Sequence, residues 1–201
     1  IPTGVYVERF AAGDGAPVRR EHRIPDDAFV VGHMGRLAWE KNVVFLADAV
    51  IDFLRERDDG YFLLVGGGEA EQSIVGRFEA AGLAERLKRC GILEGAALAD
   101  AMNAMNVFAF ASRSETQGMV LTEAMASGLP VVGLDASGVR EVVRDRENGR
   151  LLIDDSRAAY ASALRWVRSL DRDEDEQLVA GARATADAFA LERSAATALS
   201  C

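Results

Sequence analysis

The segment "GHMGRLAWEKN" (32–42) places two basic side chains close behind a glycine. Gly35 is followed at once by Arg36, and Lys41 comes five residues later. A glycine lets a ligand approach the backbone, an arginine can hold phosphate oxygens with its bidentate fork, and a lysine adds a point charge. The segment is therefore compatible with a diphosphate site. It is also compatible with solvated loop charges in which Lys41 pairs with Glu40.

A second candidate site surrounds Gly118 in "SRSETQGMVLTEAMASGLPVV" (112–132), where Glu115 and Glu123 stand on either side of the glycine. On one continuous helix these carboxylates would point ~80° apart, so a loop at Gly118 must bring them together. A helix over 119–127 would then aim the amides of Gly118, Met119 and Val120 at an anion, and the carboxylates would accept sugar hydroxyls. A nucleotide sugar offers these groups side by side. The alternative is one glutamate that stabilises the helix dipole and one surface glutamate.

Both segments follow apolar runs that we expect to be strands. Such runs occur at 28–34, 61–67, 86–92, 106–112, 129–135 and 149–154, and segments with helical spacing lie between them, as at 42–57. The alternation predicts an α/β fold: a Rossmann-like, doubly wound parallel sheet of about six strands with helices on both faces. Right-handed crossovers would bring the loops after the strands, and both candidate sites, to one edge of the sheet.

The remaining segments predict a single domain over 1–201. From Ser156 onward the pattern indicates two helices, 156–170 and 174–189, joined by the acidic linker "DRDED" (171–175). The segment "GDGAP" (13–17) predicts a turn.

Composition narrows the class of protein. The 201 residues are 49% hydrophobic and carry a formal net charge of −9, which disfavours a nucleic-acid partner. We expect no membrane insertion, because no apolar run reaches the roughly 18 residues that span a bilayer. The two cysteines are too few for a disulfide framework, so a cytoplasmic location is expected. The two histidines lack the partners of a metal site.

Three motifs together resemble a known family. In order they are "GRLAWEKN" (35–42), "SETQGMVLTEAMASGLPVV" (114–132) and "GVREVVRDRENGRLL" (138–152). They resemble the C-terminal, donor-binding half of the retaining glycosyltransferases of family 4, or group 1, which have the two-domain GT-B architecture. The resemblance covers nearly the whole chain. It implies that the N-terminal acceptor domain is absent from this chain.

The resemblance assigns roles to individual residues. Arg36 and Lys41, beside Gly35, would bind the donor diphosphate, and Glu123 would bind the ribose hydroxyls. Glu115 would hold hydroxyls of the transferred sugar, helped by the backbone of Gln117, Gly118, Met119 and Val120. The base would lie on the main chain of Ile92 and Leu93. Gln117 replaces an aromatic residue that many members have, which bears on donor identity.

The resemblance also implies the chemistry. Transfer would proceed with retention and without a metal or cofactor, the donor's own phosphate helping to deprotonate the acceptor. Arg36 and Lys41 would neutralise the departing diphosphate. The donor would be a UDP-glucose-like nucleotide sugar, with GDP and ADP sugars left open, and a lipid is one candidate acceptor. The whole protein would then lie in the cytoplasm or at the inner face of the membrane, and this chain alone would turn over poorly.

Other functions give different expectations. A non-catalytic nucleotide-binding or scaffolding domain would bind nucleotide without releasing sugar, and a GT-B epimerase would change the sugar while leaving it attached. The segment "VGGGEAE" (65–71) lacks the spacing of a dinucleotide loop, and no P-loop pattern is present.

Overall fold

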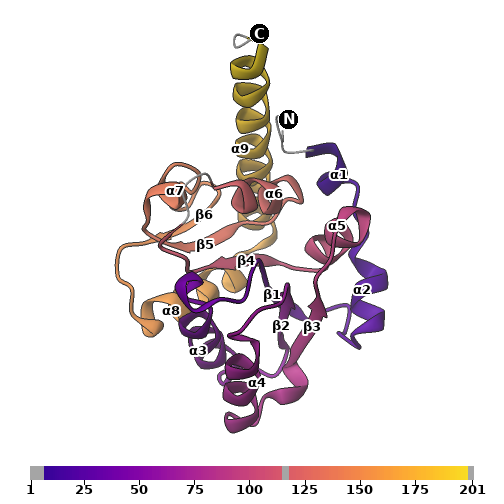
Figure 1. Ribbon diagram of the computed structural model, residues 1–201, viewed down its shortest axis with the longest axis vertical. Helices are drawn as coiled ribbons and strands as arrows, with labels where there is room; N and C mark the ends of the chain where they lie inside the picture. The colour runs from indigo at the N-terminus through magenta and orange to yellow at the C-terminus, as the bar shows by residue number, and fades with distance from the viewer. Residues whose placement is uncertain (1–6, 115–117, 199–201) are drawn as a thin grey trace.

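The computed structural model describes residues 7–114 and 118–198, with side chains described through residue 190. Within these ranges the chain forms one α/β body around a central sheet, from which the end of the last helix projects (Figure 1).

Six parallel strands form the sheet, in the order β3-β2-β1-β4-β5-β6. Their bounds are β1 Phe29–Met34, β2 Gly60–Val65, β3 Leu87–Gly91, β4 Val107–Phe110, β5 Val131–Leu134 and β6 Gly149–Leu152. The four inner strands are almost entirely buried, which agrees with their continuous apolar sequences. The predicted fold class and the six predicted strands are confirmed.

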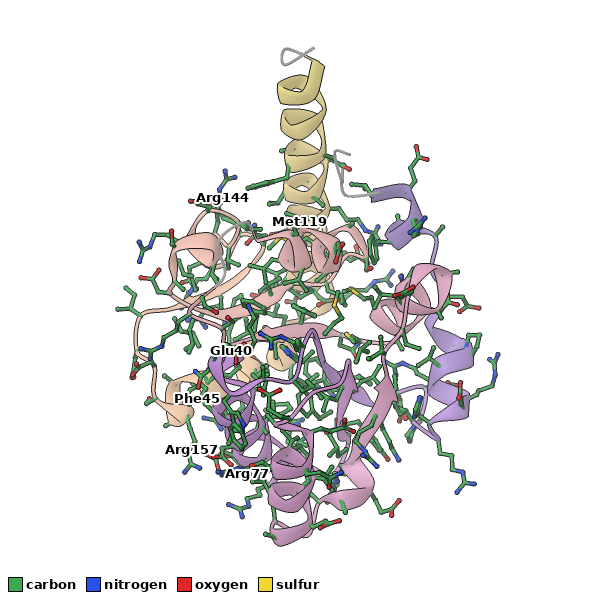
Figure 2. The ribbon with its side chains drawn as sticks, viewed as in Figure 1. Glu40, Phe45, Arg77, Met119, Arg144 and Arg157 are labelled. Carbon is green, nitrogen blue, oxygen red and sulfur yellow. The ribbon has the colours of Figure 1, made fainter. Side chains whose placement is uncertain are left out.

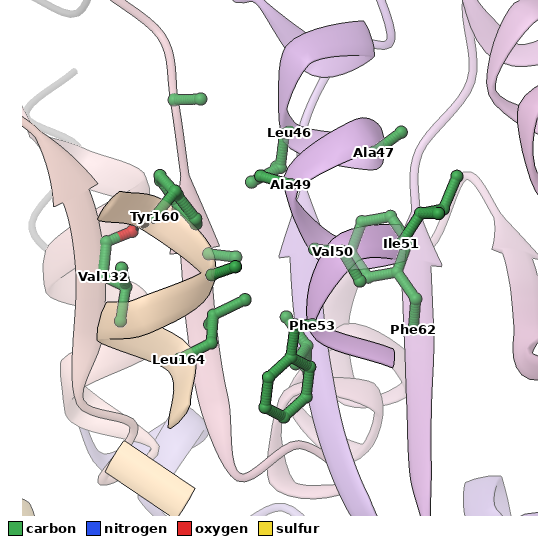
Figure 3. Close-up of a cluster of buried hydrophobic side chains, with 14 of the residues drawn as sticks. Leu46, Ala47, Ala49, Val50, Ile51, Phe53, Phe62, Val132, Tyr160 and Leu164 are labelled. Carbon is green, nitrogen blue, oxygen red and sulfur yellow. Dashed lines mark hydrogen bonds between the residues drawn. The ribbon is translucent and has the colours of Figure 1, made fainter. Parts of the chain in front are cut away.

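Three helices cover one face of the sheet: α3 Val43–Leu54, α4 Glu71–Ala80 and α8 Arg157–Ser169. Figure 3 shows side chains of α3, among them Leu46, Val50 and Phe53, between the side chains of α8 and Phe62 of β2. Tyr160 of α8 is fully buried at this face, and its hydroxyl bonds to β4 and β5. Tyr160 therefore ties this helical layer to the neighbouring strands β4 and β5.

The other face is covered mainly by α1 Val7–Ala11, α2 Gly15–Glu21, α5 Gly95–Asn103, α6 Met119–Ala126 and α9 Arg172–Ala198. Its core combines Met102, Leu121 and Met125 with the two buried alanines of α9, Ala182 and Ala186. The short elements η1 Trp39–Lys41, η2 Ala84–Arg86 and α7 Ser137–Arg140 lie in the connections. Among the described residues, no helix combines the length and the apolar character that a bilayer crossing requires.

Two predicted connections differ from the structure. The acidic segment 171–175 is not a linker, because α9 begins at Arg172. Asp171 accepts a hydrogen bond from the amide of Glu174, and the Glu174 carboxylate accepts one from the amide of Asp171. This reciprocal capping starts the helix, and acidic residues suit its first turn. Likewise the predicted turn at 13–17 ends in a helix, since Asp14 caps α2.

The sheet order has one topological switch point, between β1 and β4. The chain winds outward from β1 to β3 and then returns to the centre at β4. In open α/β sheets, ligands bind at the carboxyl ends of the strands beside such a point. The loops after Met34 and Phe110, which carry the two candidate sites, meet there.

Candidate functional site

A cavity of about 280 Å³ lies at the switch point. Its lining comes from the end of β1 and the following loop, the end of β4, and the first turns of α6. The lining residues are His33, Met34, Gly35, Arg36, Lys41, Phe110, Met119, Val120 and Glu123. In Figure 2 the labels Glu40 and Met119 locate η1, which contributes Lys41 to the lining, and the start of α6, which contributes Met119, Val120 and Glu123. Six residues of the predicted donor site thus share one cavity.

Arg36 enters the cavity from the loop after β1. Its guanidinium donates to the carboxylate of Glu40, four residues later, and both side chains are about half exposed or more. An exposed ion pair of this kind contributes little stability, because water competes for both partners. The guanidinium can therefore be transferred to an anionic ligand at small cost.

Lys41 is held at the other side of the same loop. Its ammonium lies 3.5 Å from the hydroxyl of Ser114, in the loop after β4. The next residue, Asn42, adopts a left-handed conformation and donates from Nδ2 to the carbonyl of Ala111 at 3.2 Å. Asparagine tolerates this conformation better than most residues. The loop after β1 that carries Arg36 and Lys41 (35–42) is the basic loop. Asn42 thus ties the basic loop to the end of β4 across the switch point.

Two glycines of the loop after β2, Gly66 and Gly68, pack closely against the same basic loop. The Leu37 amide donates to the carbonyl of Gly67, and a Cβ on Gly66 or on Gly68 would collide with the carbonyl of Gly35 or of Leu37. Both glycines have positive φ. The glycine-rich segment that failed the dinucleotide pattern therefore has a positioning role beside the site.

The first turn of α6 closes the cavity from the side of β4. Gly118 caps the helix with φ of 61°, and a Cβ there would meet the side chain of Val142 at 2.6 Å. The amides of Met119 and Val120 lie in the first turn, where a helix offers them no internal partner. Glu123 lies one turn further along the same helix and lines the cavity. The amino end of α6 favours a bound anion. The neighbouring Glu123 carboxylate can accept hydrogen bonds from hydroxyl groups.

His33 forms the floor of the cavity, and its side chain is 2% exposed. Nδ1 lies 2.9 Å from the carbonyl of Ala109, and the ring stacks near Phe108 and Phe110. Burial lowers the pKa of His33 to about 4, so the ring is neutral near pH 7. Its Nε2 is buried without a hydrogen-bond partner among the described residues.

The other predicted site residues lie elsewhere or cannot be placed. Ile92 and Leu93 follow β3 at the same edge of the sheet but do not line this cavity; Ile92 is exposed, and Leu93 packs partly against the core. Glu115 and Gln117 lie outside the described residues. Gly118 adjoins the cavity as the cap of α6.

Sequence reasoning missed three residues of this region. His33 was considered only as a metal ligand, although a polar residue in an otherwise apolar strand, two positions before Gly35, is a usable signal. Asn42 and Ser114 act through contacts between loops that are far apart in the sequence. The spacing of residues within either loop does not predict those contacts.

The comparisons with known proteins agree with this geometry. A family model described as "Glycosyl transferases group 1" matches residues 16–185. The chain belongs to the group 1 glycosyl transferases. It is 33% identical over 202 residues to a D-inositol 3-phosphate glycosyltransferase of Geodermatophilus obscurus, covering 96% of the chain and 44% of that relative. It is 38% identical over 141 residues to a GDP-mannose-dependent alpha-mannosyltransferase of Mycolicibacterium smegmatis, covering 70% and 35%. The chain therefore spans less than half the length of these curated relatives.

Solved structures show the same half of the architecture. HepE of Anabaena, crystallised with UDP and glucose, superposes with a TM-score of 0.84 at 26% identity, over 98% of this chain and 54% of that one. The C-terminal domain of a group 1 glycosyl transferase from Francisella tularensis superposes with a TM-score of 0.80 at 22% identity, over 92% and 97%. The expected GT-B half and the family resemblance are confirmed.

Proposed function

We propose that this chain is the donor-binding half of a glycosyltransferase and holds a nucleotide sugar in the cavity at the switch point. The observation that carries the proposal is the composition of that one cavity. It combines Arg36 and Lys41, the first turn of α6 and the carboxylate of Glu123. These groups complement a diphosphate flanked by hydroxyls.

The roles follow from the chemistry of each group. Arg36 and Lys41 bind the diphosphate, together with the amides of Met119 and Val120, and Glu123 accepts hydroxyls of the ribose. Glu115 and the backbone of Gln117 hold the transferred sugar, as the family resemblance implies. The base extends along the sheet edge toward Ile92 and Leu93. That direction is available because β3 lies two strands from β1 at the same edge.

The reaction that fits this site is sugar transfer with retention and without a metal ion. Arg36 and Lys41 neutralise the diphosphate as it leaves, and the phosphate itself helps to deprotonate the acceptor. Catalysis then depends on positioning and on charge stabilisation in a partly desolvated cleft. No carboxylate of this half acts as a nucleophile.

The names of similar proteins bear on donor and acceptor. Solved neighbours contain UDP, one of them together with glucose, whereas two of the curated relatives are named GDP-mannose-dependent. UDP-glucose therefore remains the donor that we propose, with GDP-mannose as the second candidate. Relatives named for inositol phosphate or phosphatidyl-inositol support a polar or lipid-linked acceptor, bound by a preceding acceptor domain. The whole protein would act in the cytoplasm or at the inner face of the membrane.

Calorimetric titration of the chain with UDP-glucose and with GDP-mannose tests the proposal. We expect one of them to bind, and Arg36→Ala or Lys41→Ala to weaken binding at least about tenfold, the effect of losing a charge-assisted contact. Arg172→Ala is the matched control, because Arg172 forms the same exposed Arg–Glu pair, with Glu176, at the start of α9. If neither nucleotide sugar bound, or if the Arg36 variant bound like the native chain, the proposal would fail.

A further inference from the structure

Among the described residues that line the cavity, Nε2 of His33 is a buried side-chain nitrogen without a hydrogen-bond partner. Ala109 contributes a carbonyl oxygen to the other ring nitrogen, and a carbonyl only accepts. The ring proton must therefore be on Nδ1, and Nε2 carries a lone pair that can only accept. A buried nitrogen without a hydrogen bond is unfavourable, and a bound hydroxyl would remove that cost.

The approach to Nε2 passes over Gly35. If a Cβ is built on Gly35, Nε2 of His33 is the only heavy atom found within 4 Å of it among the described residues, chain neighbours aside, at 3.8 Å. The φ of Gly35 is 153°, and its backbone lines the cavity together with the His33 ring. Nε2 itself has almost no solvent-accessible surface. A hydroxyl that bonds to Nε2 would reach it beside Gly35, a residue that has no side chain of its own.

The neighbouring groups select the kind of ligand atom. Arg36 and Lys41 provide donors for phosphate oxygens, and Glu123 provides an acceptor for hydroxyls, in the same cavity. An accepting nitrogen in the same cavity does not complement a phosphate oxygen, which is itself an acceptor. A hydroxyl group is the part of a nucleotide sugar that complements it.

We propose that His33 is a specificity-determining residue of the donor site, whose Nε2 accepts a hydrogen bond from a hydroxyl of the bound nucleotide sugar. This inference rests on the proposed function. The hydroxyl belongs either to the transferred sugar or to the ribose. The alanine carbonyl fixes the tautomer, and the rings of Phe108 and Phe110 fix the plane of the imidazole.

Two substitutions separate this role from a structural one. In His33→Asn the side-chain amide can keep the bond to the Ala109 carbonyl while Nε2 is removed, whereas His33→Gln can return an acceptor to the position of Nε2. We expect the asparagine variant to bind UDP-glucose, or GDP-mannose if that is the donor, about fivefold more weakly, and the glutamine variant to recover most of the loss. A loss seen only with the sugar nucleotide assigns the sugar hydroxyl. An equal loss with UDP or GDP alone assigns the ribose.

A spectroscopic measurement tests the contact directly. The chain has two histidines, so the imidazole nitrogen spectrum of the native protein contains His22 as an internal control. Saturating donor should move the Nε2 resonance of His33, leave it in the unprotonated range, and leave His22 in place. If the native chain binds donor with an unmoved His33 resonance and the asparagine variant binds equally well, the inference is wrong while the proposed function stands. If the native chain binds no donor, both fall.

Discussion

The carbonyl oxygen of Gly35 occupies the space that a side chain on Gly66 would need. The loop after β2 therefore contacts the basic loop backbone to backbone. This contact constrains the position of the loop that carries Arg36. Positive φ at Gly66 adds a second reason for glycine at that position.

Gly66→Ala should accordingly destabilise the protein by about 1–3 kcal/mol and weaken donor binding, because the basic loop must move away. Gly76→Ala is the matched control, since Gly76 lies on the exposed side of α4 with open space around its Cβ position. That change should stabilise the helix by up to about 1 kcal/mol. Urea unfolding of both variants, with donor titrations, checks the prediction. Equal effects of the two substitutions would contradict it.

Glu40 pairs with the Arg36 guanidinium and, if the proposed function holds, must compete with the diphosphate for it. Removing its charge in Glu40→Gln should tighten binding of the nucleotide diphosphate by about threefold at low salt, the scale of an exposed ion pair. The gain should shrink in high salt, because screening weakens both the pair and the ligand contact. Glu176→Gln, which breaks the corresponding pair with Arg172, should change nothing. Unchanged or weaker binding in Glu40→Gln would show that Arg36 does not leave Glu40.

Burial of His33 makes stability depend on pH. Its pKa is about 4 in the folded protein against an ordinary value of 6.5, so below pH 6.5 the unfolded chain binds a proton that the folded chain does not. The free energy of unfolding must then fall as the pH drops from about 6.5 toward 4, by about 2 kcal/mol between pH 7 and pH 5. The substitution His33→Asn removes the imidazole. It leaves in place the charged side chains that share its cavity, Arg36, Lys41 and Glu123.

Denaturant unfolding at pH 7 and pH 5 measures this contribution. His33→Asn should lose about 2 kcal/mol less than the native chain over that interval, whatever its stability at pH 7. His22 is present in both proteins and cancels. Parallel losses would mean that the His33 imidazole titrates normally.

Tyr160 joins α8 to the end of β4 and to β5. Its hydroxyl accepts from the Phe110 amide at 2.8 Å and donates to the Val132 carbonyl at 2.6 Å, and burial raises the pKa of this phenol. Tyr160→Phe leaves both backbone groups without a partner and should cost about 2 kcal/mol of stability. Tyr61→Phe, on the half-buried Tyr61 of β2, should cost less. Comparable melting temperatures for the two variants would argue against the bridge.

The strands and the family could be predicted because their signals are local. A strand buried on both faces reads as a continuous apolar run, and the segment 106–112 became β4 for that reason. The prediction of a linker at 171–175 was wrong because it was based on the high density of charged residues, which is typical of linkers. The Asp171–Glu174 pair that starts α9 uses the same residues as a cap.

The site could be predicted only in part. Arg36, Lys41 and Glu123 were identified by residue type and came together because the topology brings the loops after β1 and β4 to one point. The unpaired state of His33 Nε2 among the described residues follows from the bond of the other ring nitrogen to the carbonyl of Ala109, 76 residues away. It also follows from the position of Gly35, which has no side chain, beside the ring. Neither is visible in the order of residues, since both arise from packing between strands.

The central claim, that the cavity between β1 and β4 is the donor diphosphate site, is tested most directly by a crystal structure of the chain with its nucleotide sugar bound. The account predicts diphosphate oxygens within hydrogen-bond distance of Arg36 and Lys41, with ribose hydroxyls on Glu123. A ligand bound at any other edge of the sheet, with these three side chains unmoved and unliganded, would contradict it.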